Sequence, residues 1–342
     1  MENFKHYVLS SNSKNGFYNN FKFLNNNTKK SFTYILKGGP GTGKSSLMKL
    51  VGEHFSALNF TVEYFHCSSD IESLDGVRIA EHNIAIIDGT APHTMDTNIP
   101  QVDSRIVNLG DFIGNGVAKH EKQIRALLDT KKEAYKLAYI HLESAGRLQD
   151  ANLFLQEKYS NEKANQKLAK KIVKDLGLCP TTTKGYERKL FWGTADTETN
   201  KFLKHNKYQR ILRVPSTKFD FSMIAKDISS ALVKKGYEII AIFDPISPEI
   251  QVAVVIPRTS TVIVSSENQP FGLSKFEMNL ISQNTETIEF LLKNSNQLLQ
   301  NAKTAHKKVE AYYVTNMDFK GVQKTARNLI KEISTKIHDR QI

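Results

Sequence analysis

The stretch SFTYILKGGPGTGKSSLMKL, residues 31–50, joins a short apolar run to a glycine-rich turn and to the start of a helical pattern. Residues 32–37 are typical of a buried strand, and apolar residues recur three and four positions apart after Ser45. The turn between them, Gly38 to Ser45, satisfies the pattern G-x-x-x-x-G-K-[ST]. A strand, this turn and a helix in that order predict a phosphate-binding loop in an α/β protein.

Each residue type in this turn has a chemical reason to be there. Glycines let the backbone curl until consecutive N–H groups face one anion, and the N-terminus of the following helix adds its dipole. We expect Lys44 to reach the β- and γ-phosphates of a nucleotide and the Ser45 hydroxyl to bind Mg²⁺. The residues predicted to hold the nucleotide are Gly38, Gly39, Pro40, Gly41, Thr42, Gly43, Lys44, Ser45 and Ser46.

A magnesium nucleotide also needs a carboxylate at the end of an apolar strand. Asp88, which closes the run IAIID, fits this role and would share the metal ion with Ser45. The alternative is an aspartate that caps a turn, because Asp-Gly is common turn chemistry. Both interpretations place Asp88 at a strand end.

The residue that orients the attacking water is less clear from the sequence. Many P-loop ATPases have a glutamate directly after the magnesium aspartate, where this chain has Gly89. Asp70 in HCSSD is favoured as a catalytic residue, because ligands of open α/β sheets collect at the carboxyl edge of neighbouring strands; an Asx turn or helix cap is its alternative. The further candidates are Asp75, Thr90 and His93. His66 and Cys67 are interpreted as a strand end and not as metal ligands.

The flanking pattern returns later in the chain. Ile35-Leu36-Lys37 has a counterpart in residues 211–213, VEYFHC in EIIAIFD, and NIAIIDGTAPH in TSTVIVSSENQP, all about 175 residues apart. A charged, Ala- and Leu-rich segment from about residue 118 to 175 predicts a helical pair. We therefore expect two related three-layer α/β units of the P-loop NTPase type with mostly parallel sheets. Each would carry a helical hairpin, within domains 1–182 and 183–342.

The segments GFYNNF, ILKGGPGTGKSSLMK, HCSSDIESLDGV and IAIIDGTAPH together resemble a family of bacterial tandem P-loop ATPases without an assigned cellular role. The resemblance is close over the first 110 residues or so. It implies a nucleoside triphosphatase fold, with Gly38 to Ser45 as phosphate loop and Asp88 as magnesium carboxylate. It also raises Asp70 and His93 as candidates.

The second half departs from that family, in which the second copy usually keeps a glycine-rich loop. When the two halves are aligned on residues 35–37 (ILK) and 211–213 (ILR), the loop GGPGTGKSS corresponds to VPSTKFDFS. The glycines are lost, and Asp220 takes the position of Lys44. Such a loop cannot wrap a phosphate, and Asp220 would repel one. The sequence predicts a single competent nucleotide site.

Composition limits the partners and the compartment. The net charge of +12 favours polyanionic partners. It is concentrated in residues 201–218, which contain Lys201, Lys204, Lys207, Arg210, Arg213 and Lys218 and no acidic residue. With Phe191, Trp192, Phe202 and Tyr208 nearby, this run is a candidate surface for nucleic acid or protein, although a solvated basic face is favoured.

Two distant cysteines and the lack of a long apolar segment predict a cytoplasmic protein without a membrane span.

The expected function is Mg²⁺-dependent binding and hydrolysis of ATP in the first copy. One alternative is a kinase that transfers the γ-phosphoryl group to a small acceptor, because the same cradle serves both reactions. The other is a slow, nucleotide-dependent regulatory module whose basic second copy grips a nucleic acid or a protein. We also expect the second copy to offer cations to the phosphates, with Arg210, Arg213 and Lys218 as candidates.

Overall fold

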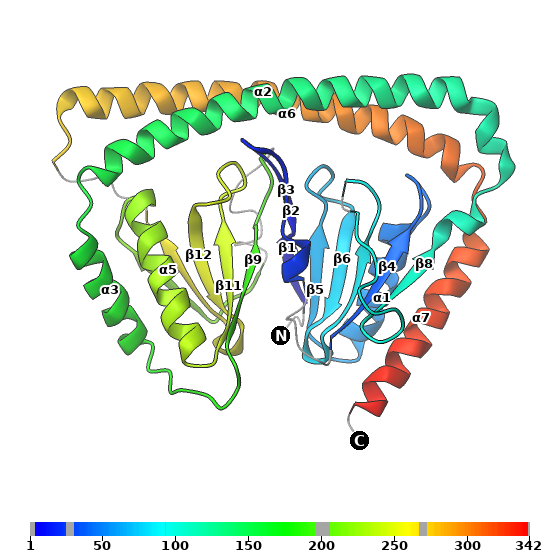
Figure 1. The fold of residues 1–342 in the computed structure, drawn as a ribbon, viewed down its shortest axis with the longest axis horizontal. Coiled ribbons are helices and arrows are strands. Elements are labelled where there is room, and N and C mark those ends of the chain that lie inside the picture. The colour runs from blue at the N-terminus through cyan, green and yellow to red at the C-terminus, as the bar shows by residue number, and fades with distance from the viewer. Residues whose placement is uncertain (1–3, 25–30, 93, 196–205, 267–271, 341–342) are drawn as a thin grey trace. The chain divides into compact units, whose positions relative to one another are not determined.

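The computed structural model describes residues 4–24, 31–92, 94–195, 206–266 and 272–340 (Figure 1). It is an α/β protein with two main sheets, each mixed but mostly parallel. Within the described residues, every helix is too short or too polar to cross a membrane.

The first sheet has the order β1-β5-β6-β7-β4-β8. Its strands are β1 (Phe4–Val8), β4 (Phe32–Lys37), β5 (Val62–His66), β6 (Leu74–Ile79), β7 (Ile84–Asp88) and β8 (Ser104–Asn108). The strands predicted at β4, β5 and β7 are confirmed. β6 runs antiparallel to β5 and to β7, so these three strands form a meander and not the parallel crossover expected from the sequence.

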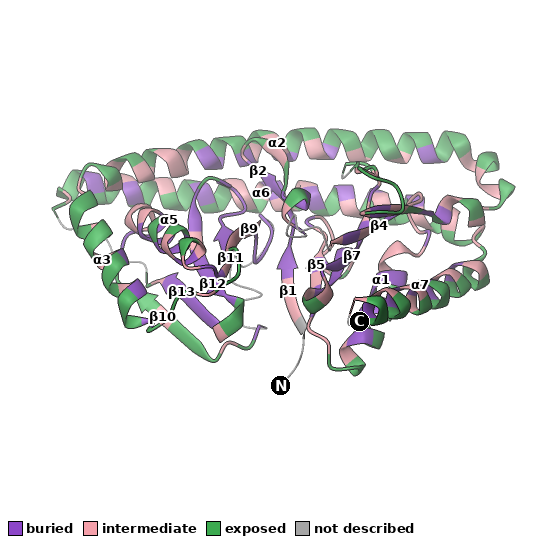
Figure 2. Ribbon diagram, turned by 60° about the horizontal axis from the view of Figure 1, so that its bottom comes forward, coloured by how far each residue is buried: buried purple, intermediate pink, exposed green. Residues whose placement is uncertain are grey.

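Two helices cover one face of this sheet. α1 (Lys44–Ala57) buries Leu47, Met48, Val51 and Phe55 in a core that includes the inward side chains of β4, β6 and β7. α7 (Phe319–Asp339) completes this core with apolar side chains at helical spacing, visible as buried positions in Figure 2. The α7 residues are Val322, Ala326, Leu329, Ile333 and Ile337.

The second sheet has the order β10-β13-β12-β11-β9. Its strands are β9 (Tyr186–Leu190), β10 (Arg210–Val214), β11 (Glu238–Phe243), β12 (Gln251–Ile256) and β13 (Thr261–Ser265), of which β12 is antiparallel to both neighbours. α5 (Lys218–Lys234) packs on β11 and β12, and α3 (Glu162–Asp175) packs on α5.

The remaining regular elements are two long helices and a small hairpin. The long helices are α2 (Glu121–Glu157) and α6 (Lys275–Val314), and the hairpin consists of β2 (Ser10–Ser13) and β3 (Gly16–Asn19). α2 and α3 confirm the helical pair predicted between residues 118 and 175.

The chain forms two compact units that are interleaved along the sequence. The first unit contains Met1–Leu9, Leu24–Leu137 and Gln297–Ile342, and the second contains Ser10–Phe23 and Ala138–Asn296. These units differ from the contiguous domains 1–182 and 183–342. Apolar faces explain the difference: α3 buries Ala169 and Val173 in the core of the second unit, whereas α7 completes the core of the first.

Candidate phosphate-binding site

The loop between β4 and α1 has the conformation that its glycines make possible. Gly41 and Gly43 have φ angles of 69° and 85°, in the left-handed region that L side chains rarely adopt. Gly43 is the N-cap of α1, so the helix begins directly at Lys44. The loop therefore opens onto a helix N-terminus, the usual environment for a bound anion.

Lys44 folds back over this loop. Its Nζ donates to the carbonyl oxygens of Gly38 at 2.9 Å and Gly39 at 2.8 Å. It also lies 3.6 Å from Oδ2 of Asp88, which ends β7, the strand paired with β4. The structure thus brings together the predicted phosphate lysine and the predicted magnesium carboxylate.

The two carboxylate oxygens of Asp88 have different neighbours. Oδ1 accepts from the backbone N–H and the hydroxyl of Thr90, at 2.9 and 2.5 Å, while Oδ2 faces Lys44. The two interpretations of Asp88 are therefore compatible, because one oxygen stabilises the turn and the other faces the loop.

The oxygen atoms near the loop suit Mg²⁺. Ser45 Oγ accepts from the N–H of Leu74 at 3.0 Å and keeps a second lone pair. Mg²⁺ usually binds through one or two protein oxygens together with phosphates and waters. Ser45 and Asp88 are thus donors of the right kind, although nowhere in the described chain do three or more His, Cys, Asp or Glu residues form a metal cluster.

Close packing explains why glycine follows Asp88. The N–H of Gly89 donates to the Leu36 carbonyl at 2.9 Å, and a Cβ atom at Gly89 would lie 2.3 Å from Cγ2 of Ile35. A glutamate could occupy this position only if the Ile35 side chain moved. Any carboxylate that orients water must therefore come from another segment.

Asp70 lies further from the loop strand than the sequence suggested. Two strands, β6 and β7, separate β5 from β4, so Asp70 does not follow a neighbouring strand. Its carboxylate forms a 2.8 Å ion pair with Lys303 and accepts from Ser73. Burial acts to raise the pKa of Asp70, but the hydrogen bond and charge of Lys303 hold it below its usual value.

The other candidates have separate positions. Asp75 is buried at the start of β6, and the Thr90 hydroxyl donates to Asp88. His66 Nε2 lies 2.8 Å from Nδ1 of His6. His93 lies outside the described residues.

Sequence reasoning missed four polar residues of the first unit that come from α2 and α6. Lys303, His306 and Glu310 are spaced three and four positions apart on α6, so they share one helix face. The His306 Nδ1 atom lies 3.1 Å from Nζ of Lys131 on α2, and its Nε2 atom lies 3.6 Å from Oε1 of Glu310. The helical spacing was visible in the sequence, but nothing local linked it to residues 38–44.

His306 is a neutral imidazole at physiological pH. Burial lowers its pKa to about 4, and the positive charges of Lys131 and Lys44 act in the same direction. Its Nδ1 atom can therefore accept a hydrogen bond from the Lys131 ammonium.

Glu310 lies directly against the glycine-rich loop. A Cβ atom at Gly41 would lie 2.9 Å from the Glu310 carbonyl oxygen, and one at Gly39 would lie 3.1 Å from the Tyr313 ring. Burial raises the pKa of the Glu310 carboxyl, while the N–H of Gly41 hydrogen-bonds to it and acts in the opposite direction. A protein carboxylate thus accepts from an N–H group of the loop.

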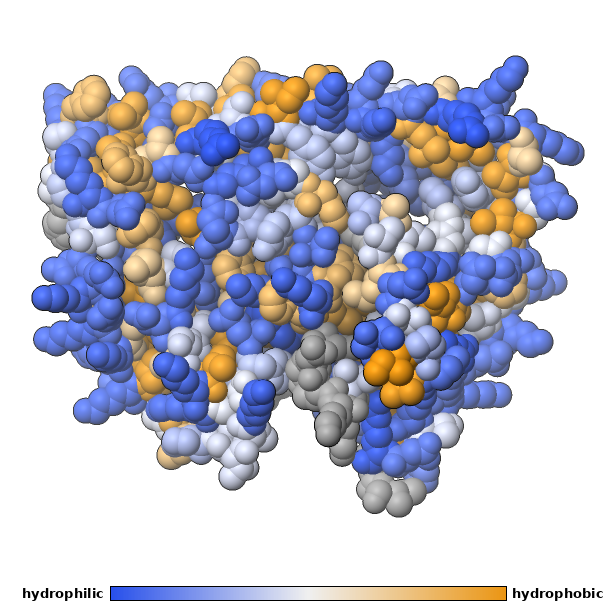
Figure 3. Space-filling view, in the orientation of Figure 1, coloured by the Kyte–Doolittle hydropathy of each residue, from blue (hydrophilic) through white to orange (hydrophobic). Residues whose placement is uncertain are grey.

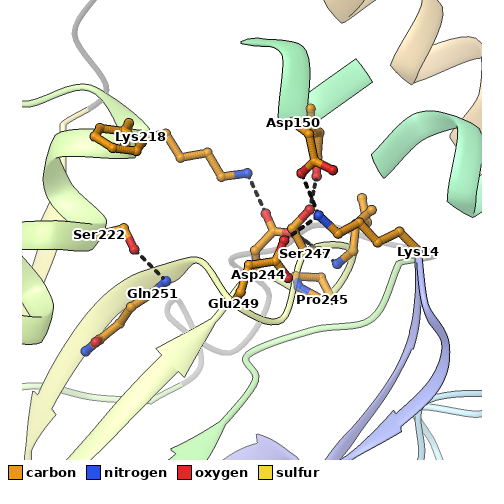
Figure 4. A network of polar contacts seen from close by, with 12 residues as sticks. Lys14, Asp150, Lys218, Ser222, Asp244, Pro245, Ser247, Glu249 and Gln251 are labelled. Atoms are coloured by element: carbon orange, nitrogen blue, oxygen red, sulfur yellow. Dashed lines mark hydrogen bonds and ion pairs between the residues drawn. The ribbon is translucent and has the colours of Figure 1, made fainter. Parts of the chain in front are cut away.

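The corresponding connection in the second unit is built differently. Only residues 215–217 join β10 to α5, and Thr217 caps the helix, because its Oγ1 accepts from the Asp220 N–H at 3.0 Å. The helix begins at Lys218, so Lys218 has the position at the start of α5 that Lys44 has at the start of α1, and Asp220 lies two residues further into the helix. The Lys218 Nζ atom lies 2.6 Å from Oδ2 of Asp244, at the end of β11 (Figure 4).

Asp244 is the centre of a polar network in the second unit. Its Oδ1 accepts from the N–H groups of Ile246 and Ser247, both at 2.9 Å. Burial acts to raise the pKa of Asp244, but Lys218 and these N–H groups keep it low. Nearby, Lys14 pairs with Asp150 at 2.5 Å and with Glu249 (Figure 4).

The described aromatic residues near the basic run differ in exposure. Tyr208 is half-buried, and its ring centroid lies 6.3 Å from that of Trp192. Phe191 and Trp192 are buried in the second unit, whereas Arg210 and Arg213 are exposed on the edge strand β10. Lys201, Lys204 and Phe202 lie outside the described residues. The face drawn in Figure 3 is largely hydrophilic, with apolar side chains in separate patches.

Comparisons of the chain with protein-family models, with curated proteins and with solved structures found no match.

Proposed function

We propose that the first unit binds MgATP at residues 38–46 and hydrolyses it. The observation that carries this proposal is the position of Lys44, which lies between the loop carbonyls and Asp88 at the end of the adjacent strand. On nucleotide binding Lys44 moves its hydrogen bonds from these carbonyls to the phosphates. Ser45 and Asp88 would hold Mg²⁺, which would offset the negative charge of the phosphates.

We also propose that the two units are P-loop NTPase-type copies produced by duplication. The shared strand order supports this: β9-β11-β12-β13-β10 matches β1-β5-β6-β7-β4, with one antiparallel strand at the same place in each. Only the first copy binds nucleotide. From Val214 to Lys218 the second has no residue with positive φ, and Lys218 is neutralised by Asp244.

Replacing Lys44 tests the proposal. Lys44→Ala should abolish ATP binding or turnover and leave the fold intact, because the Nζ atom contacts loop carbonyls and Asp88, not the apolar core. Isothermal titration with MgATP should give about one site per chain for the wild type, since one loop is competent. Lys49→Ala, on the exposed side of α1, is the matched control. Equal affinity and turnover in both variants would refute the assignment.

Asp88→Asn tests the metal role separately. We expect this variant to keep part of its nucleotide affinity and lose most hydrolysis together with its dependence on magnesium. Released phosphate, measured in a single turnover with and without candidate acceptors, RNA or DNA, distinguishes hydrolysis from phosphoryl transfer. Wild-type magnesium dependence in Asp88→Asn would assign Asp88 to the turn alone.

A further inference from the structure

Lys131 is a half-buried cation without a carboxylate partner among the described residues. Its ammonium group lies 3.1 Å from the neutral imidazole of His306 and 5.9 Å from the centre of the Tyr135 ring. No salt bridge joins it to a described Asp or Glu, whereas Lys303 on the facing helix is already paired with Asp70 at 2.8 Å.

Burial opposes the charge of the Lys131 ammonium group, and the negative charge of Glu310 offsets only part of this cost. Taking an ammonium group out of water disfavours its charged form, and burial lowers the pKa of Lys131 accordingly. A neutral imidazole satisfies one of its three donor positions and supplies no charge. A phosphate oxygen would supply both an acceptor and a negative charge.

Lys131 is linked to the glycine-rich loop through His306 and Glu310. Its Nζ atom lies 3.1 Å from His306 Nδ1, and His306 Nε2 lies 3.6 Å from Oε1 of Glu310. Tyr135, one turn along α2, donates its hydroxyl to Ser69 Oγ at 2.7 Å, beside Asp70. The charge of Glu310 acts on both Lys131 and Lys44, and its carboxylate accepts from the Gly41 N–H. An anion that replaced this carboxylate at Gly41 would therefore lie in the field of both lysines.

We propose that Lys131 contacts the terminal phosphate of the nucleoside triphosphate, so that α2 supplies the site with a second cation. This inference rests on the proposed function. His306 acts as a positioning residue, because its Nδ1 atom holds the ammonium group in place. The cation comes from a helix of the first unit and not from Arg210, Arg213 or Lys218 of the second.

The experiment compares ATP and ADP. Lys131→Met keeps the aliphatic stem and removes the charge, Lys131→Arg restores a charge, and Lys132→Met on the exposed side of α2 is the control. Affinities for MgATP and MgADP are measured by isothermal titration, and turnover by phosphate release. Loss of one charge-assisted hydrogen bond should lower the ATP affinity or turnover of Lys131→Met about ten- to a hundred-fold. The affinity for ADP should change little, and Lys131→Arg should recover part of the loss.

The outcomes separate this inference from the proposed function. The terminal-phosphate role is wrong if Lys131→Met has the same ATP affinity and turnover as Lys132→Met, or if it loses affinity for ATP and ADP equally. In either case, a loss of ATP binding or turnover in Lys44→Ala would still support the loop assignment. A wild-type protein that binds no nucleotide would overturn both. Circular dichroism and thermal melting of each variant exclude a loss of folding as the cause.

Discussion

At the scale of single residues, Glu310 places a negative charge where the loop would bind a phosphate. Its carboxylate accepts from the Gly41 N–H, and its pKa is raised by burial and by the neighbouring Asp70. A phosphate bound as proposed would compete with this carboxylate for the Gly41 N–H. Glu310 would therefore have to withdraw before the phosphate could bind.

Glu310→Gln should bind ATP more tightly than the wild type. Removing a like charge beside the phosphates favours binding by about 1 kcal/mol, which corresponds to an affinity gain of several-fold. Titration with MgATP measures the change, and Glu289→Gln, an exposed position of the same helix, is the control. Unchanged affinity with a loss of turnover would show that Glu310 acts in the reaction and does not compete with the phosphates.

The residues of the site differ in how far the sequence could predict them. The loop and Asp88 were found because their chemistry is local: glycine spacing, a lysine and a strand-end carboxylate. Lys131, His306 and Glu310 belong to α2 and α6. Lys131 and His306 are 175 residues apart, and Glu310 packs on Gly41, which lies 269 residues earlier in the chain. No local pattern reports such a contact.

At the scale of elements, β6 shows why the sheet was only partly predictable. Its sequence LDGVRI contains Asp, Gly and Arg, which are not typical of a central strand. The fold accommodates Arg78 because Glu63 on β5 pairs with it at 2.8 Å and Asn83 accepts from it at 2.7 Å. The strands β4, β5 and β7 contain more apolar and β-branched or aromatic residues, and they were identified from the sequence.

The start of α5 should depend on the pair between Lys218 and Asp244. Lys218→Met leaves the buried Asp244 carboxylate without its cation, and we expect a loss of about 2 kcal/mol in the stability of the second unit. Trp192 is the single tryptophan of the chain and is buried in this unit, so its fluorescence in a urea titration reports the change.

The double variant Lys218→Met/Asp244→Asn is the control for that prediction. The asparagine oxygen can still accept from the N–H groups of Ile246 and Ser247, but it carries no charge. Much of the lost stability should therefore return. If the double variant is less stable than Lys218→Met, the charge of Asp244 is stabilised by the N–H groups and not by Lys218.

At the scale of the whole molecule, the interleaved units make the first sheet depend on the far end of the chain. The four larger α7 side chains in its core, those of Val322, Leu329, Ile333 and Ile337, each contribute about 1.5–3 kcal/mol by burial, on the order of 10 kcal/mol together. This is comparable with the entire stability of a typical domain. The sequence predicted both α/β cores, but not that α3 and α7 are exchanged between them.

A chain that ends at Asn316 should therefore lose the first unit and keep the second. We expect no ATP binding, a reduced helix content and unchanged Trp192 emission, because Trp192 lies in the unit that α7 does not complete. Hydrogen exchange should show fast exchange in β4 and β7 and protection in β11 and β12. Retained ATP binding in this truncated chain would show that α7 is dispensable for the loop.

The same interleaving sets an order of events on the ribosome. All segments of the second unit have been synthesised once Asn296 has emerged, whereas the first unit waits for α7 although its β4 strand was among the earliest segments made. A nascent chain therefore holds residues 38–45 on an unfinished sheet until α7 has been synthesised. The glycine-rich loop reaches its final environment only after every segment of the second unit has been made.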